Sequence, residues 1–90
     1  MAYFAVTYDL IEKDREDYQE LYDELNFLQA HRYQESCWFV DADMTTIELR
    51  NLLSTHMEDK DRLMVIMFST KPAGKRSLPG TTAWLNARFP

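Results

Sequence analysis

The chain has 90 residues, of which 46% are hydrophobic, and this is enough for one small domain with a modest core. Two Gly and three Pro exclude a linker-rich chain, and the single cysteine, Cys37, excludes an internal disulfide framework and a cysteine-type zinc site. No apolar run approaches the roughly 18 residues of a membrane span, and no signal-peptide pattern opens the chain. We therefore expect a cytoplasmic protein with no membrane partner.

Charge is distributed unevenly along the chain. All fifteen acidic residues lie between Asp9 and Asp61, whereas the tail, residues 69–90, carries four of the ten basic residues and no acid. The body would repel a phosphate backbone and the tail would attract one, with Lys75 and Arg76 as the candidate nucleic-acid-binding pair. The alternative is that the basic tail docks on the acidic body, or on that of a second subunit.

The first predicted element is a strand over residues 2–9, AYFAVTYD. Alternation places Phe4, Val6 and Tyr8 on one face, which we expect to be buried, and Asp9 at the end of the other. A helix follows, with Asp14 as its cap and an apolar stripe at helical spacing. The stripe consists of Tyr18, Leu21, Tyr22, Leu25 and Leu28.

Residues 31–40, HRYQESCWFV, predict a second strand. One face would carry Tyr33, Cys37 and Phe39, with Cys37 in the core, and the other would carry Gln34, Ser36 and Trp38. A face of that mixed character is typical of partner contacts, so these last three residues are the candidate dimer interface, with Trp38 as its anchor.

Thr45 and Glu48 form a capping box that predicts a second helix, continuing to Met57. The apolar run 63–68, LMVIMF, predicts a central strand buried on both faces. Residues 69–80 contain two Pro and two Gly and predict a loop with room for one short edge strand. Thr81 is a candidate cap for a last short helix.

This order of elements predicts a single α+β domain over residues 1–90. With one further strand from the tail, it matches the split βαβ pattern of ferredoxin-like βαββαβ sandwiches. Two helices would cover one face of an antiparallel sheet, and the bare opposite face would pair with a second copy to give a homodimer.

The strong catalytic signatures are absent from the sequence, including GxxxxGK[ST], GxGxxG and HExxH. Asp9 is the remaining candidate. It either accepts backbone N–H bonds in the following turn, or it holds a metal ion together with Asp9 of a second subunit. A cation such as Mg2+ at that place could orient water for attack on a phosphodiester, and the Ser36 hydroxyl could serve as a further ligand.

Three segments resemble one family. YFAVTYDL resembles the opening strand of the small CRISPR-associated endonuclease of the adaptation complex, and HRYQESCWF resembles its second strand. The ending is similar to the GTxxWLxxRF pattern of the stand-alone SinR-like relatives. It is carried here by Gly80, Thr81, Trp84, Leu85, Arg88 and Phe89.

The resemblance implies a ferredoxin-like homodimer and a Mg2+- or Mn2+-dependent nuclease on RNA or DNA, with Asp9 as catalytic metal ligand. Other members of the family serve only as scaffolds. The acidic helix face, the exposed aromatic residues and the thin catalytic inventory favour a second hypothesis, a catalytically silent dimeric binding module in a defence, anti-defence or toxin–antitoxin system. In that case an acidic surface would bind a protein partner, and a passive structural role is a third option.

Overall fold

The structure is a computed structural model that describes residues 2–11 and 18–90. Along the chain its elements are β1 (Ala2–Asp9), α1 (Gln19–Phe27), β2 (His31–Gln34), β3 (Cys37–Ala42), α2 (Thr46–Ser54), β4 (Arg62–Phe68) and α3 (Thr81–Arg88). The expected Asp14 cap lies outside the described residues. The strand over residues 2–9 and the two principal helices are confirmed.

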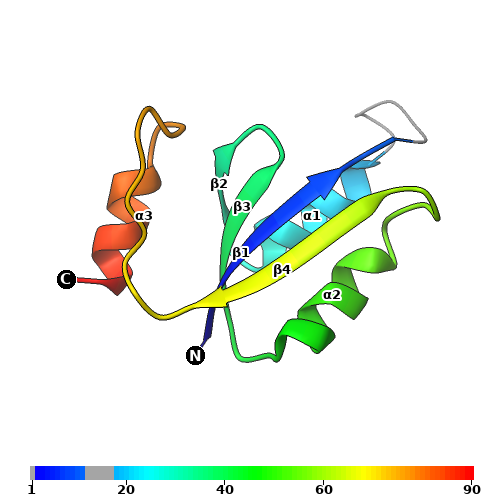
Figure 1. Ribbon diagram of the computed structural model, residues 1–90, viewed down its shortest axis with the longest axis horizontal. Coiled ribbons are helices and arrows are strands. Elements are labelled where there is room, and N and C mark those ends of the chain that lie inside the picture. The colour runs from blue at the N-terminus through cyan, green and yellow to red at the C-terminus, as the bar shows by residue number, and fades with distance from the viewer. Residues whose placement is uncertain (1, 12–17) are drawn as a thin grey trace.

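The four strands form one antiparallel sheet in the order β2-β3-β1-β4 (Figure 1). Helices α1 and α2 pack on one face of this sheet, which we call the covered face. The other face, which we call the open face, carries alternate residues of the same strands and is partly overlaid by α3. This small α+β architecture is compatible with the predicted ferredoxin-like fold.

The fourth strand comes from residues 31–42 and not from the tail. These residues were predicted as one strand, but they form a hairpin in which Glu35 and Ser36 make the turn between β2 and β3. Neither Gly nor Asn marks this turn, so the sequence lacks the usual two-residue hairpin signal. Residues 69–80 form no strand, and the expected edge strand in the tail was wrong.

The hairpin also reverses the predicted faces of β3. Its register pairs Val6 with Trp38 and Ala5 with Phe39, so Trp38 points to the covered face and Phe39 to the open face. Trp38 is only 5% exposed. The expectation that Trp38 lies on an open face as a dimer anchor is therefore wrong, and Cys37 lies on the open face and not in the core.

Strand β4 lies at one edge of the sheet and was wrongly predicted as central. Met64, Ile66 and Met67 are 59%, 51% and 53% exposed, so the apolar run 63–68 is not buried on both faces. Periodicity alone does not distinguish a central strand from an edge strand with an apolar outer surface.

A polar cluster lies within the core between the covered face and the two helices. The Tyr8 hydroxyl accepts hydrogen bonds from Trp38 Nε1 (2.9 Å) and Arg32 Nη2 (3.2 Å). The Arg32 guanidinium lies over the rings of Tyr22 and Trp38, 4.9 Å from each centroid. A half-buried guanidinium is costly without partners, and these contacts offset part of that cost.

Each of the two principal helices has a recognisable local motif at one terminus, the first turn of α2 and the last turn of α1. The capping box of α2 is confirmed, because Thr45 Oγ1 accepts from Glu48 N (3.1 Å) and Glu48 Oε1 accepts from Thr45 N (2.9 Å). Helix α1 closes in a Schellman motif, in which Gln29 N donates to Asn26 O and Ala30 N donates to Leu25 O. Gln29 has φ of 56°, a left-handed conformation usually taken by glycine.

The short helix α3 docks on one end of the open face through aromatic rings. Phe39 packs against Tyr33, Phe68 and Trp84, and Phe89 packs against Tyr3 and Phe68. Arg88 Nε donates to Asp41 Oδ2 at 2.9 Å, so part of the basic tail does dock on the acidic body. The cap of α3 is Gly80, with φ of 93°, and Thr81 was wrongly predicted in that role.

Candidate functional site on the open sheet face

Asp9 lies at the end of β1 on the open face, as predicted. Its carboxylate is 69% exposed, and Arg62 Nη1 is 3.9 Å from Asp9 Oδ2. The pairing of β1 with β4 aligns these two residues directly. An exposed, loosely held pair of this kind stabilises the fold little, so the carboxylate remains accessible to solvent and to ligands.

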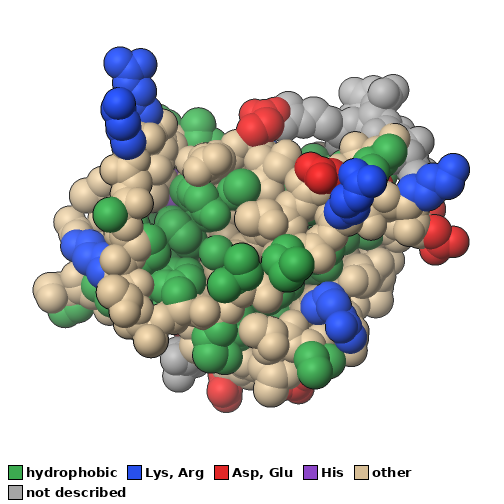
Figure 2. Space-filling view, viewed as in Figure 1, with side chains coloured by type: hydrophobic (Ala, Val, Ile, Leu, Met, Phe, Trp, Pro, Cys, Tyr) green, Lys and Arg blue, Asp and Glu red, His purple; other side chains and the backbone are tan. Residues whose placement is uncertain are grey.

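An exposed apolar strip extends from this pair along β4. On the open face, Met64 lies beside Thr7 and Ile66 lies beside Ala5. Figure 2 shows hydrophobic side chains gathered over the middle of this view, between α3 and the region where Figure 1 draws the end of β1. A flat, partly apolar face of an antiparallel sheet is suited to pairing with a second sheet.

Two other predicted residues lie close to this strip. The carbonyl oxygen of Ser36, in the hairpin turn, accepts a hydrogen bond from Tyr8 N at 3.1 Å. The turn therefore lies next to the residue of β1 that directly precedes Asp9. Gln34 is exposed at the end of β2 and lines a cleft, described below, that shares Ile66 with the strip. Ser36 and Gln34 thus border the open face, whereas Trp38 does not.

Asp9 by itself does not make a metal centre. Among residues 2–11 and 18–90, no three His, Cys, Asp or Glu side chains come together as a metal-binding group. Hard cations such as Mg2+ take about six oxygen ligands, and one carboxylate with a nearby guanidinium does not fit this need within one chain. The predicted metal site therefore depends on a second subunit.

A cleft of about 400 Å³ lies between the open face and the tail. Its floor comes from Ala5, Phe39, Ile66 and Phe68, and Tyr33 and Gln34 of β2 form one wall. The loop 70–77 and Leu85 of α3 form the opposite wall. We call this the aromatic cleft.

The loop that closes this cleft is tied to β2 at two points. Leu78 N donates to Tyr33 O (3.0 Å), and His31 Nε2 lies 2.7 Å from Thr81 Oγ1. The Thr81 hydroxyl donates its proton to Leu78 O, so His31 must donate through Nε2–H. Burial lowers the pKa of His31, which favours this neutral form.

Lys75 and Arg76 are both exposed near the tip of that loop, but they face different hollows. Lys75 lines the aromatic cleft, and Arg76 lines a second hollow on the other side of the loop. In Figure 1 this loop and the end of β1 lie on opposite sides of the β2–β3 hairpin. The structure therefore does not bring the predicted nucleic-acid-binding pair together with Asp9.

A third surface feature lies on α1. Phe27 is 82% exposed, beside Glu20, Asp23 and Glu24, which together with His56 line a shallow hollow of about 380 Å³. His56 Nε2 lies 3.2 Å from Glu24 Oε1 and Nδ1 lies 3.7 Å from Glu20 Oε2. This surface of α1 thus combines one exposed aromatic ring with three carboxylates.

Sequence reasoning missed Arg62 and the aromatic cleft. The position of Arg62 beside Asp9 depends on strand register, and the cleft depends on where α3 docks, so neither leaves a local signal in the sequence.

No helix among the described residues is long and apolar enough to cross a membrane. No family model matches the chain.

Proposed function

We propose that the protein is a cytoplasmic homodimer related to the CRISPR-associated endonucleases, in which the Asp9 side chains of two subunits share Mg2+ or Mn2+. The substrate would be a phosphodiester bond of RNA or DNA. The observation that carries the proposal is the position of Asp9, exposed on the open face beside the apolar strip of Met64 and Ile66.

Burial of the apolar strip would favour pairing of two subunits, and the Asp9 carboxylates would favour binding of a cation between them. Two copies that cover their strips by facing each other near the end of β1 would bring two Asp9 carboxylates together. Facing carboxylates repel unless a cation or a proton lies between them. When bound there, the cation would polarise the phosphate and activate a water molecule.

Arg62 has a supporting role in this proposal. Its guanidinium lies 3.9 Å from Asp9 and is 74% exposed, so it can turn to a non-bridging phosphate oxygen once the cation neutralises Asp9. Guanidinium groups suit that contact because their planar N–H fork matches phosphate oxygens. Asp9 would then hold the cation and Arg62 would hold the substrate.

The test combines oligomeric state with cleavage. Light scattering after gel filtration should give a dimer, and single-stranded RNA and DNA should be cleaved with Mg2+ or Mn2+ and not with EDTA. Asp9→Asn should abolish cleavage and keep the dimer. Asp23→Asn, which removes an exposed carboxylate on α1, is the matched control and should keep both.

Cleavage that survives Asp9→Asn would refute the proposal, and so would a monomer that cleaves at the wild-type rate. Met64→Asp places a charge in the strip and should abolish both dimer and cleavage. If the variant stays dimeric, the subunits pair through another surface.

The second candidate is a catalytically silent dimeric module that binds a basic protein partner in a defence, anti-defence or toxin–antitoxin system. The exposed Phe27 ring among the carboxylates of α1 favours it, because an apolar anchor within a charged rim is typical of protein interfaces. Phe27→Ser, at an 82% exposed position, should leave the fold intact and abolish capture of the partner. Capture unaffected by this variant would refute it.

A further inference from the structure

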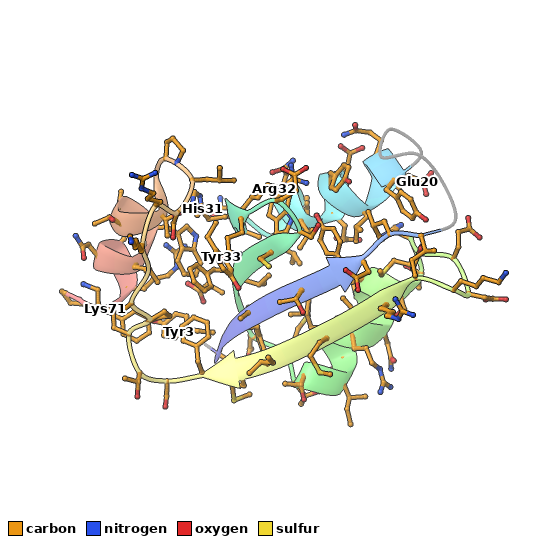
Figure 3. The ribbon with its side chains drawn as sticks, turned by 45° about the horizontal axis from the view of Figure 1, so that its top comes forward. Tyr3, Glu20, His31, Arg32, Tyr33 and Lys71 are labelled. Carbon is orange, nitrogen blue, oxygen red and sulfur yellow. The ribbon has the colours of Figure 1, made fainter. Side chains whose placement is uncertain are left out.

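The aromatic cleft is distinct from the Asp9 end of the sheet and has the size of a small-molecule site. Its volume of about 400 Å³ lies within the usual range for ligand pockets, which begins near 300 Å³. Its floor is apolar, and the ring of Phe39 packs there against those of Tyr33 and Phe68. Figure 3 shows Tyr33 directed to the α3 side of the sheet, while its neighbour Arg32 lies on the α1 side.

The charge of the cleft is opposite to that of the protein. The chain has a net charge of -5, yet among the described residues that line the cleft no side chain is acidic, and the one charged residue is Lys75. Figure 2 shows basic side chains at the upper left, over the loop that precedes α3. A ligand with one anionic group and an apolar body would therefore match this cleft better than the rest of the surface.

The polar groups at the rim suit a heteroaromatic ligand. Gln34 offers an amide that can both donate and accept, and Thr70 and Ser77 offer hydroxyls. Burial, together with the neighbouring Cys37 thiol, raises the pKa of Tyr33 to about 12, so its hydroxyl stays protonated near neutral pH. The edge of a nucleobase requires donors and acceptors of this kind, and its face requires apolar rings.

The loop that carries Lys75 is held in a strained backbone conformation. Arg76, the next residue, has φ of 57°, a left-handed conformation that is unfavourable for a residue with a Cβ. This turn sends Lys75 to the aromatic cleft and Arg76 to the hollow on the other side of the loop. Strain of this kind is characteristic of ligand-binding segments.

We propose that the aromatic cleft binds a nucleotide, with the base against the accessible sides of Tyr33 and Phe68, over the buried ring of Phe39, and the phosphate at Lys75. The nucleotide is either free in solution or part of a single strand, since both present a base with an attached phosphate. The site needs no metal and no contribution from Asp9, so it is independent of phosphodiester cleavage.

The first experiment measures binding in EDTA, using Asp9→Asn so that cleavage cannot interfere. Adenosine 5′-monophosphate and a fluorescein-labelled six-nucleotide RNA are titrated separately, with ribose 5-phosphate as the ligand that lacks a base. A base among aromatic rings should improve affinity over ribose 5-phosphate about tenfold or more. If the monophosphate binds, a free nucleotide is a sufficient ligand. If the RNA binds and the monophosphate does not, the ligand is a nucleotide within a single strand.

Two-dimensional NMR during the same titrations gives the location. The amide shifts should change most at Tyr33, Ile66 and Lys75, and little near Asp9. Equal affinity for ribose 5-phosphate, no saturable binding of either nucleotide, or shifts that map elsewhere would overturn the proposal.

The second experiment compares two charge reversals. Lys75→Glu should weaken nucleotide binding about tenfold, because it removes a charged hydrogen bond to phosphate. Arg50→Glu is the matched control, since it changes net charge equally at an exposed position of α2, on the covered side of the sheet. If both variants weaken binding to the same extent, the effect is general electrostatics and the assignment of Lys75 is wrong.

Discussion

The indole N–H of Trp38 donates a hydrogen bond of 2.9 Å to the hydroxyl of Tyr8, and both side chains are 5% exposed. The two residues come from adjacent strands, β3 and β1, and both point to the covered face. This bond fixes Trp38 in the core and removes it from any surface at which two subunits could meet.

Tyr8→Phe tests that relationship. It leaves the buried indole N–H of Trp38 and one N–H of Arg32 without their acceptor, so we expect a loss of about 1–3 kcal/mol in the free energy of unfolding, measured in urea. Tyr3→Phe removes the same hydroxyl from a half-buried ring on the open face and should cost less. An equal loss of free energy of unfolding in both variants would show that the hydrogen bonds from Trp38 and Arg32 to the Tyr8 hydroxyl add no stability.

Arg88 holds α3 against the sheet in a second testable contact. Its guanidinium pairs with Asp41 at 2.9 Å and lies 3.8 Å from the centroid of the Trp84 ring. Arg88→Met leaves a half-buried carboxylate without its cation, and we expect a loss of about 1–3 kcal/mol together with faster amide hydrogen exchange in α3. Lys71→Met, at an exposed contact with Asn86, is the control and should change neither quantity measurably.

Gln29→Gly should stabilise the protein. The native φ of 56° at Gln29 is unfavourable for a side chain with a Cβ, and glycine relieves it at the C-terminal end of α1. Because glycine also loses more entropy on folding, we expect the free energy of unfolding to rise by only about 0.5–1 kcal/mol, measured by thermal unfolding. Gln29→Ala keeps the strain and should bring no gain. A Tm that is the same or lower for Gln29→Gly would contradict the prediction.

Stability should depend on pH through His31. Burial lowers the pKa of His31 in the folded state, so below its ordinary value of 6.5 the unfolded chain binds a proton that the folded protein does not. The contribution of neutral His31 to the free energy of unfolding is therefore complete above about pH 6.5, and it is lost as the pH falls through the folded pKa. His31→Gln can still donate to Thr81 and should flatten the stability profile between pH 7 and 5. A profile as steep as that of the wild type would refute this.

Much of the local structure was predictable because its causes are local. The alternation of residues 2–9 required one apolar face and placed Asp9 at the end of the other. The capping box of Thr45 and Glu48 located the start of α2 to the residue, since both hydrogen bonds lie within one turn. These features depend on neighbours two to four positions away along the chain.

The candidate site was predictable only in part. Asp9 could be named from its strand, but Arg62 lies beside it through a register between residues 53 positions apart, which no pattern in either strand specifies. The dimer on which the shared cation depends stays a prediction. The hairpin at Glu35 and Ser36 moved Trp38 into the core, and the docking of α3 created the aromatic cleft.

The amino-acid sequence by itself determined the apolar face of β1, the two principal helices and the acid-free tail, because periodicity and capping act over short separations. Tertiary structure alone decided which face of β3 is buried, which strand forms the edge and which side chains share a hollow. Those outcomes depend on strand register and helix docking, where many weak long-range contacts compete and a shift of one residue exchanges the two faces of a strand.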